Sequence, residues 1–310
     1  MNQIICIDNG NKCHKALGRY EGSNISYSTG FIESDVEPIS KDNLLTYNGK
    51  YYSVGTGRFS TIYNKAEDER CFILSLPAIA NYLGSQFANR TTDIILAVGL
   101  PIGNYGTLKD EFKKYFTRPN EIGFNWLGVD YSVRIKECLV FPQGYSAYLT
   151  VFNEFKDTQV VCCDIGGYTA DIFTVNKGGK LDIRSATSIN RGVIRLFKDI
   201  QQQLLRKDIR ISEEQIEEVL KGSDPILIDK TIVNLINSKA KQYTESLIDE
   251  LREMGHETRM NPMLWIGGGS LLLKRFIEQS DKVGYVEFLD QYANCKGYQL
   301  LAKKALAKGE

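Results

Sequence analysis

Histidine and long apolar runs are scarce in this chain, and each scarcity excludes a class of function. Only His14 and His256 are present, without cysteine or carboxylate at ligand spacing, so we expect neither a histidine-based metal site nor a serine–histidine triad. No run approaches the roughly 20 apolar residues that span a bilayer, and the first residues do not resemble a secretion signal. We therefore expect a cytoplasmic protein without direct membrane contact.

Net charge and a disulfide framework are also lacking. Lys and Arg number 38 against 38 Asp and Glu, so no overall field recruits DNA, and a nucleic-acid partner would need a local patch or an adaptor. The seven Cys are odd in number and irregularly spaced, which favours small buried side chains over disulfides or a zinc pair. A chain of 310 residues suggests about two domains. Its chemistry must use carboxylates, amides, lysines and backbone groups.

One pattern occurs twice in the chain. An apolar run is followed by Asp8 and then by Gly10, and the run VVCC is followed by Asp164 and then by Gly166. Each Asp precedes a polar bend with a charged residue seven positions further on. A duplication separated by well over a hundred residues predicts two similar domains rather than a solenoid. We expect the two strand–turn–strand segments to face one another.

The first bend has residues that suit phosphate binding. Gly10 permits close backbone approach, N–H groups of the bend can donate to phosphate oxygens, and Lys15 supplies a positive charge. Asp8 can hold a hydrated Mg²⁺. The same Asp-Asn-Gly sequence also suits an ordinary hairpin turn, so for this bend alone both interpretations stay open.

The second bend makes the pair more informative. Asp164 and Asp171 enclose Gly166 and Gly167, and a purely structural turn needs no second Asp. Two such bends present carboxylates and N–H groups that neutralise a triphosphate through a metal. Further on, residues 267–270 (GGGS) lie between an apolar strand and a helix, where bare backbone and a helix N-terminus suit an adenosine.

Hydrophobic periodicity and turn residues predict the remaining elements. A hairpin turns at Asn48-Gly49, the strongest short-range signal for a two-residue loop. Ser212 and Gln215 form a capping box before a helix. The expected strands cover 4–7, 25–31, 44–58 (the hairpin), 93–100, 122–141, 159–163 and 263–269, and the expected helical segments cover 77–89, 108–116, 144–155, 191–249, 271–276 and 298–308.

Five segments together resemble the motifs of actin-like ATPases, in the family's chain order. DNGNKCHKA resembles its phosphate-1 motif, FPQGYSAY connect 1, DIGGYTAD phosphate-2, WIGGGS the adenosine motif and YANCKGYQLLAK connect 2. The resemblance implies an α/β actin-like ATPase fold, with two duplicated ribonuclease H-like domains around a nucleotide cleft. It places the first domain at 1–157 with a small β-rich insertion at about 32–75, the second at 158–290 with a helical lobe at about 185–260, and a C-terminal helix at 291–310 that returns to the first domain.

The resemblance also assigns roles to single residues. It implies that Asp8 and Asp164 organise Mg²⁺, usually through water. Gln143, at the position that orients the attacking water, forms the catalytic set with Asp164 and Asp171; alternatively, Gln143 caps the helix that follows it. The residues expected around the nucleotide are Asp8, Gly10, Asn11, Lys12, Lys15, Gly166, Gly167, Tyr168, Gly268, Gly269 and Ser270. Lys12 departs from the family, which usually has a small residue there, and Lys15 keeps the expected spacing for the phosphate contact.

Within this superfamily the chain is most similar to the ParM and Alp actins that segregate plasmids. It shows no substrate-binding acid of a sugar kinase, and little sequence follows connect 2. The resemblance implies an ATPase, with GTP as a possible replacement for ATP, that polymerises with itself and acts through a DNA-binding adaptor on a centromere-like plasmid site. A small-molecule kinase of the same fold and a non-polymerising regulatory ATPase are the alternatives. We expect the insertion and the helical lobe to form filament contacts, and the insertion's aromatic residues to form a small core of their own.

Overall fold

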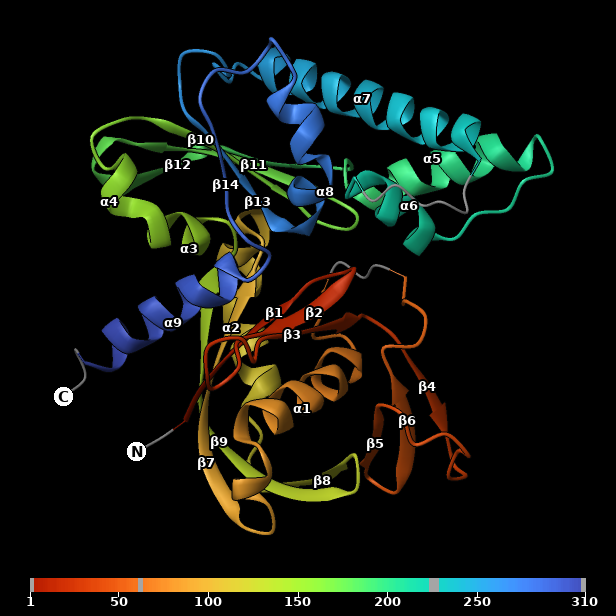
Figure 1. Ribbon diagram of the computed structural model, residues 1–310. Helices are drawn as coiled ribbons and strands as arrows, with labels where there is room; N and C mark the ends of the chain where they lie inside the picture. Colours follow the sequence, from red (N-terminus) through yellow and green to blue (C-terminus); the bar gives the residue numbers. More distant parts are fainter. Residues whose placement is uncertain (1–2, 61–63, 223–228, 308–310) are drawn as a thin grey trace. The chain divides into compact units, whose positions relative to one another are not determined.

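The computed structural model describes residues 3–60, 64–222 and 229–307, and the chain divides into two compact units. Unit 1 comprises Met1–Thr150 and Tyr292–Glu310, and unit 2 comprises Val151–Gln291. Both are coloured by sequence in Figure 1. The predicted domain boundaries and the predicted insertion stay predictions, and parts of them (1–2, 61–63, 223–228 and 308–310) lie outside the described residues.

Unit 1 is built on one nine-stranded sheet. Its strand order is β3-β2-β1-β7-β9-β8-β5-β6-β4. The strands are β1 (Gln3–Asn9), β2 (Cys13–Ala16), β3 (Ile25–Ser28), β4 (Phe31–Ser34), β5 (Leu44–Tyr47), β6 (Lys50–Val54), β7 (Thr91–Leu100), β8 (Ile122–Trp126) and β9 (Val129–Pro142). Its helices are α1 (Arg70–Leu83), α2 (Ile102–Phe116), α3 (Tyr145–Tyr148) and α9 (Ala293–Leu306), with 3₁₀ turns at Ser85–Phe87 and Leu149–Val151.

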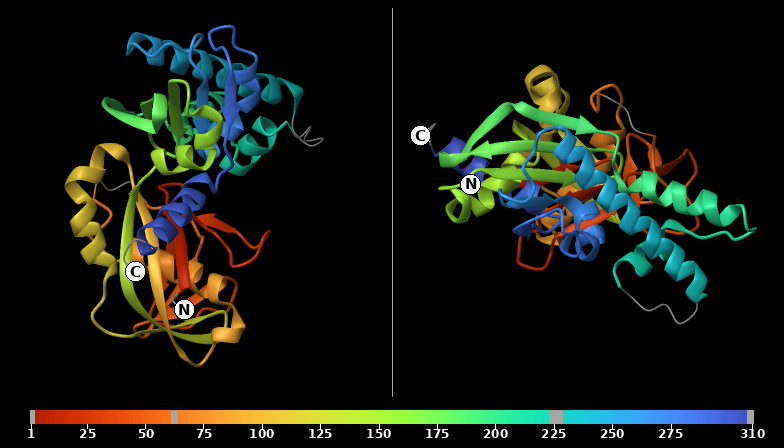
Figure 2. Two further views of the ribbon diagram at one scale, coloured as in Figure 1. Left: turned by 90° about the vertical axis from the view of Figure 1, so that its left-hand side faces the viewer. Right: turned by 90° about the horizontal axis from the view of Figure 1, so that it is seen from above.

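Unit 2 is built on a five-stranded sheet of order β12-β11-β10-β13-β14. The strands are β10 (Val160–Ile165), β11 (Ala170–Asn176), β12 (Lys180–Ile189), β13 (Met263–Ile266) and β14 (Val286–Phe288). The helices are α4 (Phe152–Phe155), α5 (Val193–Leu205), α6 (Glu213–Leu220), α7 (Lys230–Glu253) and α8 (Gly267–Glu278), with a 3₁₀ turn at Lys177–Gly179. Figure 2 shows α7 as the longest helix of this unit.

The two sheets repeat one topology. In unit 1, β3-β2-β1 pair antiparallel and β1-β7-β9 pair parallel. In unit 2, β12-β11-β10 pair antiparallel and β10-β13-β14 pair parallel. This correspondence confirms the predicted duplication. The sheet of unit 1 continues beyond β9 with β8, β5, β6 and β4. In unit 2, the connection from β12 to β13 is lengthened by α6 and α7.

The central strands of unit 1 are buried on both faces, as parallel strands usually are. Along β1, Ile5 and Ile7 join the core under α1, whereas Cys6 joins a smaller cluster with Cys295 and Tyr298 of α9. This alternation follows from the two-residue period of a strand. Helix α9 is therefore part of the packing of unit 1.

The core of unit 2 lies between its sheet and helices α5 to α8. Val161, Cys163 and Ile165 of β10 pack against apolar residues of these helices. The predicted capping box of α6 is confirmed, since the Ser212 side chain accepts from the Gln215 N–H and the Gln215 side chain from the Ser212 N–H. Six of the seven cysteines are buried and all are free, in line with the interpretation of their spacing.

Several predicted element boundaries were wrong. The strand that pairs with β1 is β2, not 25–31, so Lys15 lies on a strand rather than in the bend. Helix α1 begins at Arg70 and contains Pro77, because burial of nearly every residue outweighs the hydrogen bond that proline removes. The predicted helix 144–155 is broken into short segments. The Asn48-Gly49 turn is confirmed, with both residues at positive φ.

The aromatic residues of the predicted insertion do not form a core of their own. Tyr52 belongs to the main core of unit 1, and Tyr47 packs against Phe72 of α1 at 6.0 Å between ring centroids. Phe31 and Phe59 pack against that core and meet edge to face at 4.8 Å. Because β5 pairs with β8, these strands continue the sheet, and their aromatic side chains share its hydrophobic face.

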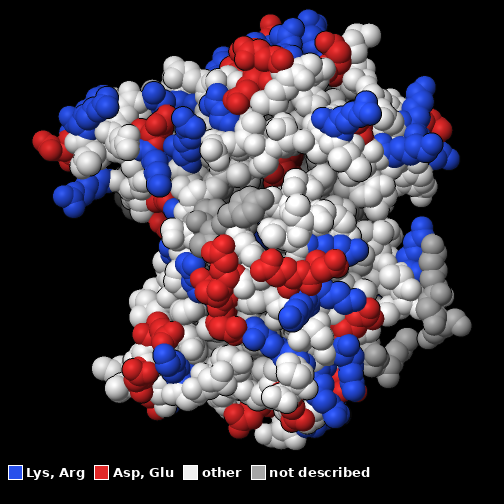
Figure 3. Space-filling model, turned by 180° about the vertical axis from the view of Figure 1, so that it is seen from behind, with Lys and Arg blue, Asp and Glu red and all other residues white. Residues whose placement is uncertain are grey.

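The surface has no strong bias in charge on the face that Figure 3 shows, where acidic and basic side chains are intermixed. This agrees with the balanced composition of the chain. None of the helices among the described residues combines the length and the apolar character needed to cross a bilayer.

Helix α9 approaches its neighbours with bare backbone. A Cβ built on Gly297 would lie 2.0 Å from the carbonyl oxygen of Ser146 in α3. On the adjoining strand, a Cβ on Gly99 would lie 2.0 Å from the hydroxyl of Tyr298. The close packing of α9 on unit 1 therefore requires glycine at both positions.

We predict that Gly297→Ala destabilises unit 1 by about 1–3 kcal/mol or more, because the added methyl group forces α9 away from α3. Gly106→Ala is the matched control, since Gly106 lies in α2 with open space around it. That change should stabilise the unit by about 0.4–1 kcal/mol. Urea unfolding measures the change in the free energy of unfolding for both substitutions. It is carried out in a Trp265→Phe background, in which the fluorescence of Trp126 alone reports on unit 1. Equal effects of the two substitutions would contradict the packing argument.

His14 should make the stability of unit 1 depend on pH. Burial, followed by the nearby charges of Lys65 and Lys15, lowers the pKa of His14 from 6.5 to about 3. Between these values the unfolded chain binds a proton that the folded chain does not, so stability falls as the pH falls, by up to about 1.4 kcal/mol per pH unit.

His14→Leu should flatten this dependence between pH 6.5 and 5. The measurement is urea unfolding of both proteins, followed through Trp126 as above. Parallel stability curves for the wild type and the variant over that range would show that His14 is not buried as a neutral group.

Candidate functional site

The first bend joins β1 to β2 and lies at the end of a buried strand (Figure 1). Asp8 pairs with Lys15 and Asn9 with His14 in the antiparallel register. The bend is closed by the N–H of Gly10, which donates to the carbonyl of Asp8 at 2.9 Å. On its outer side the hydroxyl of Thr29 donates to the carbonyl of Gly10 at 2.9 Å. The residue that directly follows β3 thus helps to fix the shape of the bend.

Asp8 is the buried carboxylate of this bend, with 4% of its surface exposed. The Nε2 of Gln143 donates to its Oδ1 at 2.7 Å, and the Nζ of Lys15 lies 3.7 Å from its Oδ2. A buried carboxylate is costly without such partners. Asp8, Lys15 and Gln143, which the sequence singled out, therefore meet in unit 1. Asp8 and Gln143 are 135 positions apart in the chain.

Backbone contacts hold Gln143 in place at the end of β9. Its N–H donates to the carbonyl of Leu100 at 2.8 Å. The N–H of the next residue, Gly144, donates at 2.8 Å to Oδ1 of Asn294 at the start of α9. The alternative in which Gln143 caps the following helix is wrong: Gly144 is the N-cap of α3, and no side chain caps it.

The two candidate lysines of the first bend differ in position. Lys15 points its ammonium group toward Asp8 from β2, whereas Lys12 lies in the bend itself, where its carbonyl accepts from the N–H of Thr29 at 3.0 Å. Asn11 lies between Gly10 and Lys12 in the same bend. The preference for Lys15 over Lys12 as the residue that contacts a phosphate stays a prediction.

The second bend joins β10 to β11 and packs against the N-terminus of α5. Asp164 pairs directly with Asp171 across the hairpin, so the two carboxylates come from neighbouring positions. The carbonyls of Gly166, Gly167 and Tyr168 accept from N–H groups of residues 192–194, at 2.9–3.2 Å. This backbone ladder fixes the bend rigidly to the helix that follows β12.

Asp164 lies at the N-terminus of α8. A Cβ on Gly267, which has φ 86°, would lie 2.4 Å from Oδ1 of Asp164 and 2.7 Å from the carbonyl of Ile165. Only glycine therefore permits this strand-to-helix turn against the carboxylate. The helix dipole favours negative charge at this point.

The three predicted adenosine residues have different surroundings. Gly268 has open space around its Cα, whereas a Cβ on Gly269 would lie 2.6 Å from the side chain of Ile165. Ser270 is fully buried and its hydroxyl donates to the carbonyl of Ile266. Gly269 and Ser270 thus have packing roles. This burial argues against a direct contact of the Ser270 hydroxyl with a ligand.

Each bend, taken by itself, has groups that suit a hydrated hard cation and phosphate. Asp8 in unit 1 and Asp164 in unit 2 each lie near the end of a strand, and carboxylate oxygens with water are the ligands that Mg²⁺ prefers. Among the described residues, no group of three or more His, Cys, Asp and Glu side chains gathers as a metal cluster. A cation held mainly through water and phosphate oxygens agrees with that finding, because Mg²⁺ usually takes only one or two carboxylates from the protein.

The sequence analysis did not assign the roles of three residues. Asn294 holds Gly144 in place, Gly192 anchors the second bend, and Gly267 makes room for Asp164. Asn294 lies in the connect 2 segment and Gly267 in the GGGS segment, so both belong to motifs that the sequence singled out. Gly192 had no signal beyond being a glycine next to a helix start.

Comparison with family models matches both units. Residues 6–145 match the model for the N-terminal domain of actin-like proteins, and residues 162–279 match the C-terminal model of the archaeal, MreB-like actin homologue. No curated protein sequence matches the chain.

Solved structures of the same fold cover nearly the whole chain. Ta0583, an archaeal actin homologue, has a TM-score of 0.75 at 19% identity, covering 97% of this chain and 99% of its own. Another structure of Ta0583 is a complex with ADP. A 15-stranded ParM filament from Clostridium botulinum has a TM-score of 0.73 at 18% identity, covering 98% and 100%.

The Alp12 filament is a third such structure, with a TM-score of 0.68 at 17% identity and coverage of 98% and 100%. At these identities the likeness shows the fold. Together with the two family models, the repeated topology and the five motifs, it establishes that the chain belongs to the actin-like proteins.

Proposed function

We propose that this actin-like protein binds ATP with Mg²⁺, hydrolyses it, and couples the reaction to assembly into filaments. The observation that supports this most is the pair of carboxylates, Asp8 and Asp164, each near the end of the central strand of its unit and each followed by a glycine-containing bend. The ADP complex of Ta0583 and the ATPase activity typical of actin-like proteins agree with the proposal.

Each unit contributes defined groups to the proposed reaction. In unit 1, Gly10 lets the phosphates approach the first bend closely, the bend at Asn11 and Lys12 offers backbone N–H groups, and Lys15 supplies a positive charge. In unit 2, Gly166 closes the second bend with its own N–H, Gly167 and Tyr168 offer backbone N–H groups to the phosphates, and the glycine turn at Gly268 offers bare backbone to the adenosine. Asp8 and Asp164 hold Mg²⁺ through water; bound Mg²⁺ neutralises phosphate charge and polarises the transferring group.

Gln143 orients the attacking water in this proposal. Its Nε2 is engaged by Asp8, so the Oε1 of the same amide can accept a hydrogen bond from water. The backbone contacts to Leu100 and Asn294 hold the side chain in position before the nucleotide binds. Asp171, paired with Asp164 across the second hairpin, is a second group that can polarise the water.

Assembly with further copies of the chain is the proposed use of the reaction. The filament structures of ParM and Alp12 favour it by analogy of fold. In this chain Ile32, Val36 and Ile39 are exposed along one segment of unit 1, as are Leu205 and Met254 in the helical part of unit 2. Large apolar side chains on a surface are candidate contacts. We further propose plasmid segregation, which the resemblance to ParM and Alp actins implies, through a DNA-binding adaptor, because the balanced charge of the chain does not favour direct DNA binding.

We predict that Gln143→Ala slows phosphate release about 10²- to 10³-fold while ATP still supports assembly, so that filaments persist. Asp164→Ala should instead weaken Mg²⁺-ATP binding, hydrolysis and assembly together, because it removes a carboxylate that organises the metal. Phosphate release and pelleted protein, followed over time at saturating ATP, distinguish the two variants. Gln279→Ala, at the exposed end of α8, is the control and should behave as the wild type.

A Gln143→Ala protein that hydrolyses ATP at the wild-type rate and disassembles normally would remove Gln143 from the mechanism. Asp171 would then become the leading candidate for orienting the water.

We predict that Ile39→Glu reduces ATP-dependent pelleting while leaving ATP binding unchanged, because it places a charge in the proposed contact and far in sequence from both bends. Tyr20→Glu, at another exposed position of unit 1, is the matched control and should pellet normally. Unchanged pelleting of the Ile39→Glu protein in an ultracentrifuge assay would exclude this segment as a filament contact.

A further inference from the structure

A small cavity lies inside unit 1, on the side of the first bend that faces α1. Its volume is about 40 Å³, and its walls include Asn9, His14, Lys65 and Arg70, together with Gly10 and Asn11 of the first bend. It involves residues of one unit only and none of the carboxylates Asp8, Asp164 and Asp171. None of the nucleotide roles proposed above uses Asn9, His14, Lys65 or Arg70.

Two buried side chains of this cavity lack hydrogen-bond partners within the described part of the chain. Asn9 is 1% exposed, yet neither its Oδ1 nor its Nδ2 has a partner. His14 is also 1% exposed, and its Nδ1 has none. Buried polar groups are nearly always paired, so such a concentration of unpaired groups on one cavity indicates that a polar ligand completes them.

The charge around the cavity is positive. Of the described residues that line it, Lys65 and Arg70 are cationic and none is acidic. Arg70 is paired with Asp68, whereas the ammonium group of Lys65 donates to the main-chain oxygen of Asn9. Within the residues that the structure describes, no carboxylate lies at ion-pair distance from Lys65. An ammonium group has three donors, so Lys65 can donate to a ligand as well.

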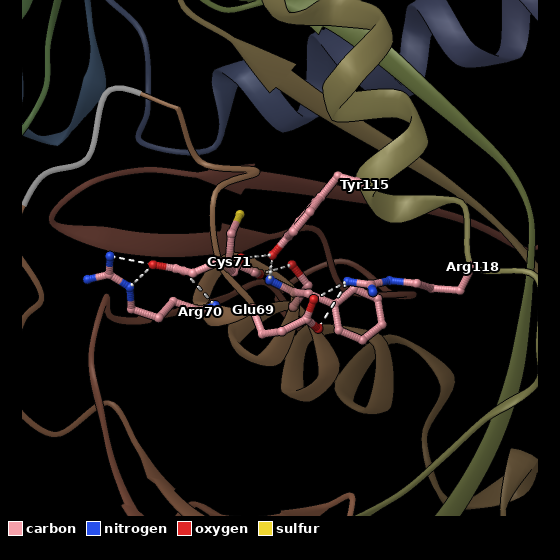
Figure 4. A network of polar contacts seen from close by, with 8 residues as sticks. Glu69, Arg70, Cys71, Tyr115 and Arg118 are labelled. Atoms are coloured by element: carbon pink, nitrogen blue, oxygen red, sulfur yellow. Dashed lines mark hydrogen bonds and ion pairs between the residues drawn. The ribbon is translucent and has the colours of Figure 1, made fainter.

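The wall formed by α1 is held rigidly, as Figure 4 shows. The hydroxyl of Tyr115 accepts from the N–H of Phe72 at 2.7 Å and donates to the carbonyl of Asp68 at 2.8 Å. Arg118 from beyond α2 donates to both carboxylate oxygens of Glu69 at 3.0 Å. The N-terminus of α1, which carries Arg70, is thus fixed from two sides. The cavity is therefore part of the fold rather than a gap between loose segments.

We propose that this cavity binds one small monovalent anion of the size of chloride, contacted by the Asn9 amide and the Lys65 ammonium group. A cavity needs about 10–15 Å³ of such space to hold one water molecule, so this cavity has room for a small anion. The anion's negative charge is balanced by Lys65. The proposal does not depend on nucleotide binding, and it explains why a polar side chain is buried at position 9.

Thermal unfolding without nucleotide tests the proposal. The wild type is compared in sodium chloride, sodium bromide and sodium gluconate at equal ionic strength, since gluconate is too large to enter. The halides should raise Tm in a saturable manner, by about 3–6 °C at ten times the dissociation constant. Lys114→Met, at an exposed lysine of α2, should keep this response, and Lys65→Met should lose it. A response that is absent, or equal in Lys65→Met and Lys114→Met, overturns the proposal.

A second measurement keeps the test decisive if Lys65→Met does not fold. Crystals of the wild-type chain grown in sodium bromide should show an anomalous peak within contact distance of Asn9 Nδ2 and Lys65 Nζ. Density for water alone at this position, without an anomalous signal, would overturn the anion and assign the cavity to bound solvent.

Discussion

The buried carboxylate of Asp8 is the constraint on which much of unit 1 depends. Its charge is tolerated because Gln143 donates to it and Lys15 lies beside it, and these two partners come from the end of β9 and from β2. The contact requires β9 to end where it does, and it requires Asn294 of α9 to hold Gly144. Burial of one acid thus links the N-terminal strand, the middle of the chain and its C-terminal helix.

The duplicated topology places Asp164 on β10 at the position that corresponds to Asp8 on β1, but its surroundings differ. Asp164 lies against the N-terminus of α8, where Gly267 leaves room for it and the helix dipole favours its charge. Unit 1 stabilises its acid with the side chains of Gln143 and Lys15, whereas unit 2 places its acid at a helix N-terminus. The two units can therefore differ in sequence almost everywhere and still present carboxylates and bends from the same points of their sheets.

Prediction from sequence succeeded where short-range chemistry decides the structure. The Asn48-Gly49 turn, the Ser212 capping box and the second hairpin with its paired acids all follow from a few neighbouring residues. It failed where tertiary packing decides. Burial carries helix α1 through Pro77, and Ser270 turned out to be packed inside α8. The resemblance gave Gln143 and Asp8 roles at one nucleotide site, but the hydrogen bond between them was not predicted, because no local pattern relates residues so far apart.

The central claim is that Asp8 holds Mg²⁺ together with ATP, and calorimetric titration tests it most directly. We expect the wild-type affinity for ATP to rise sharply when Mg²⁺ is added. Asp8→Asn preserves the size of the side chain and its contact with Gln143, and it should lose most of that Mg²⁺ dependence. An Asp8→Asn protein whose ATP affinity responds to Mg²⁺ as the wild type does would contradict the account.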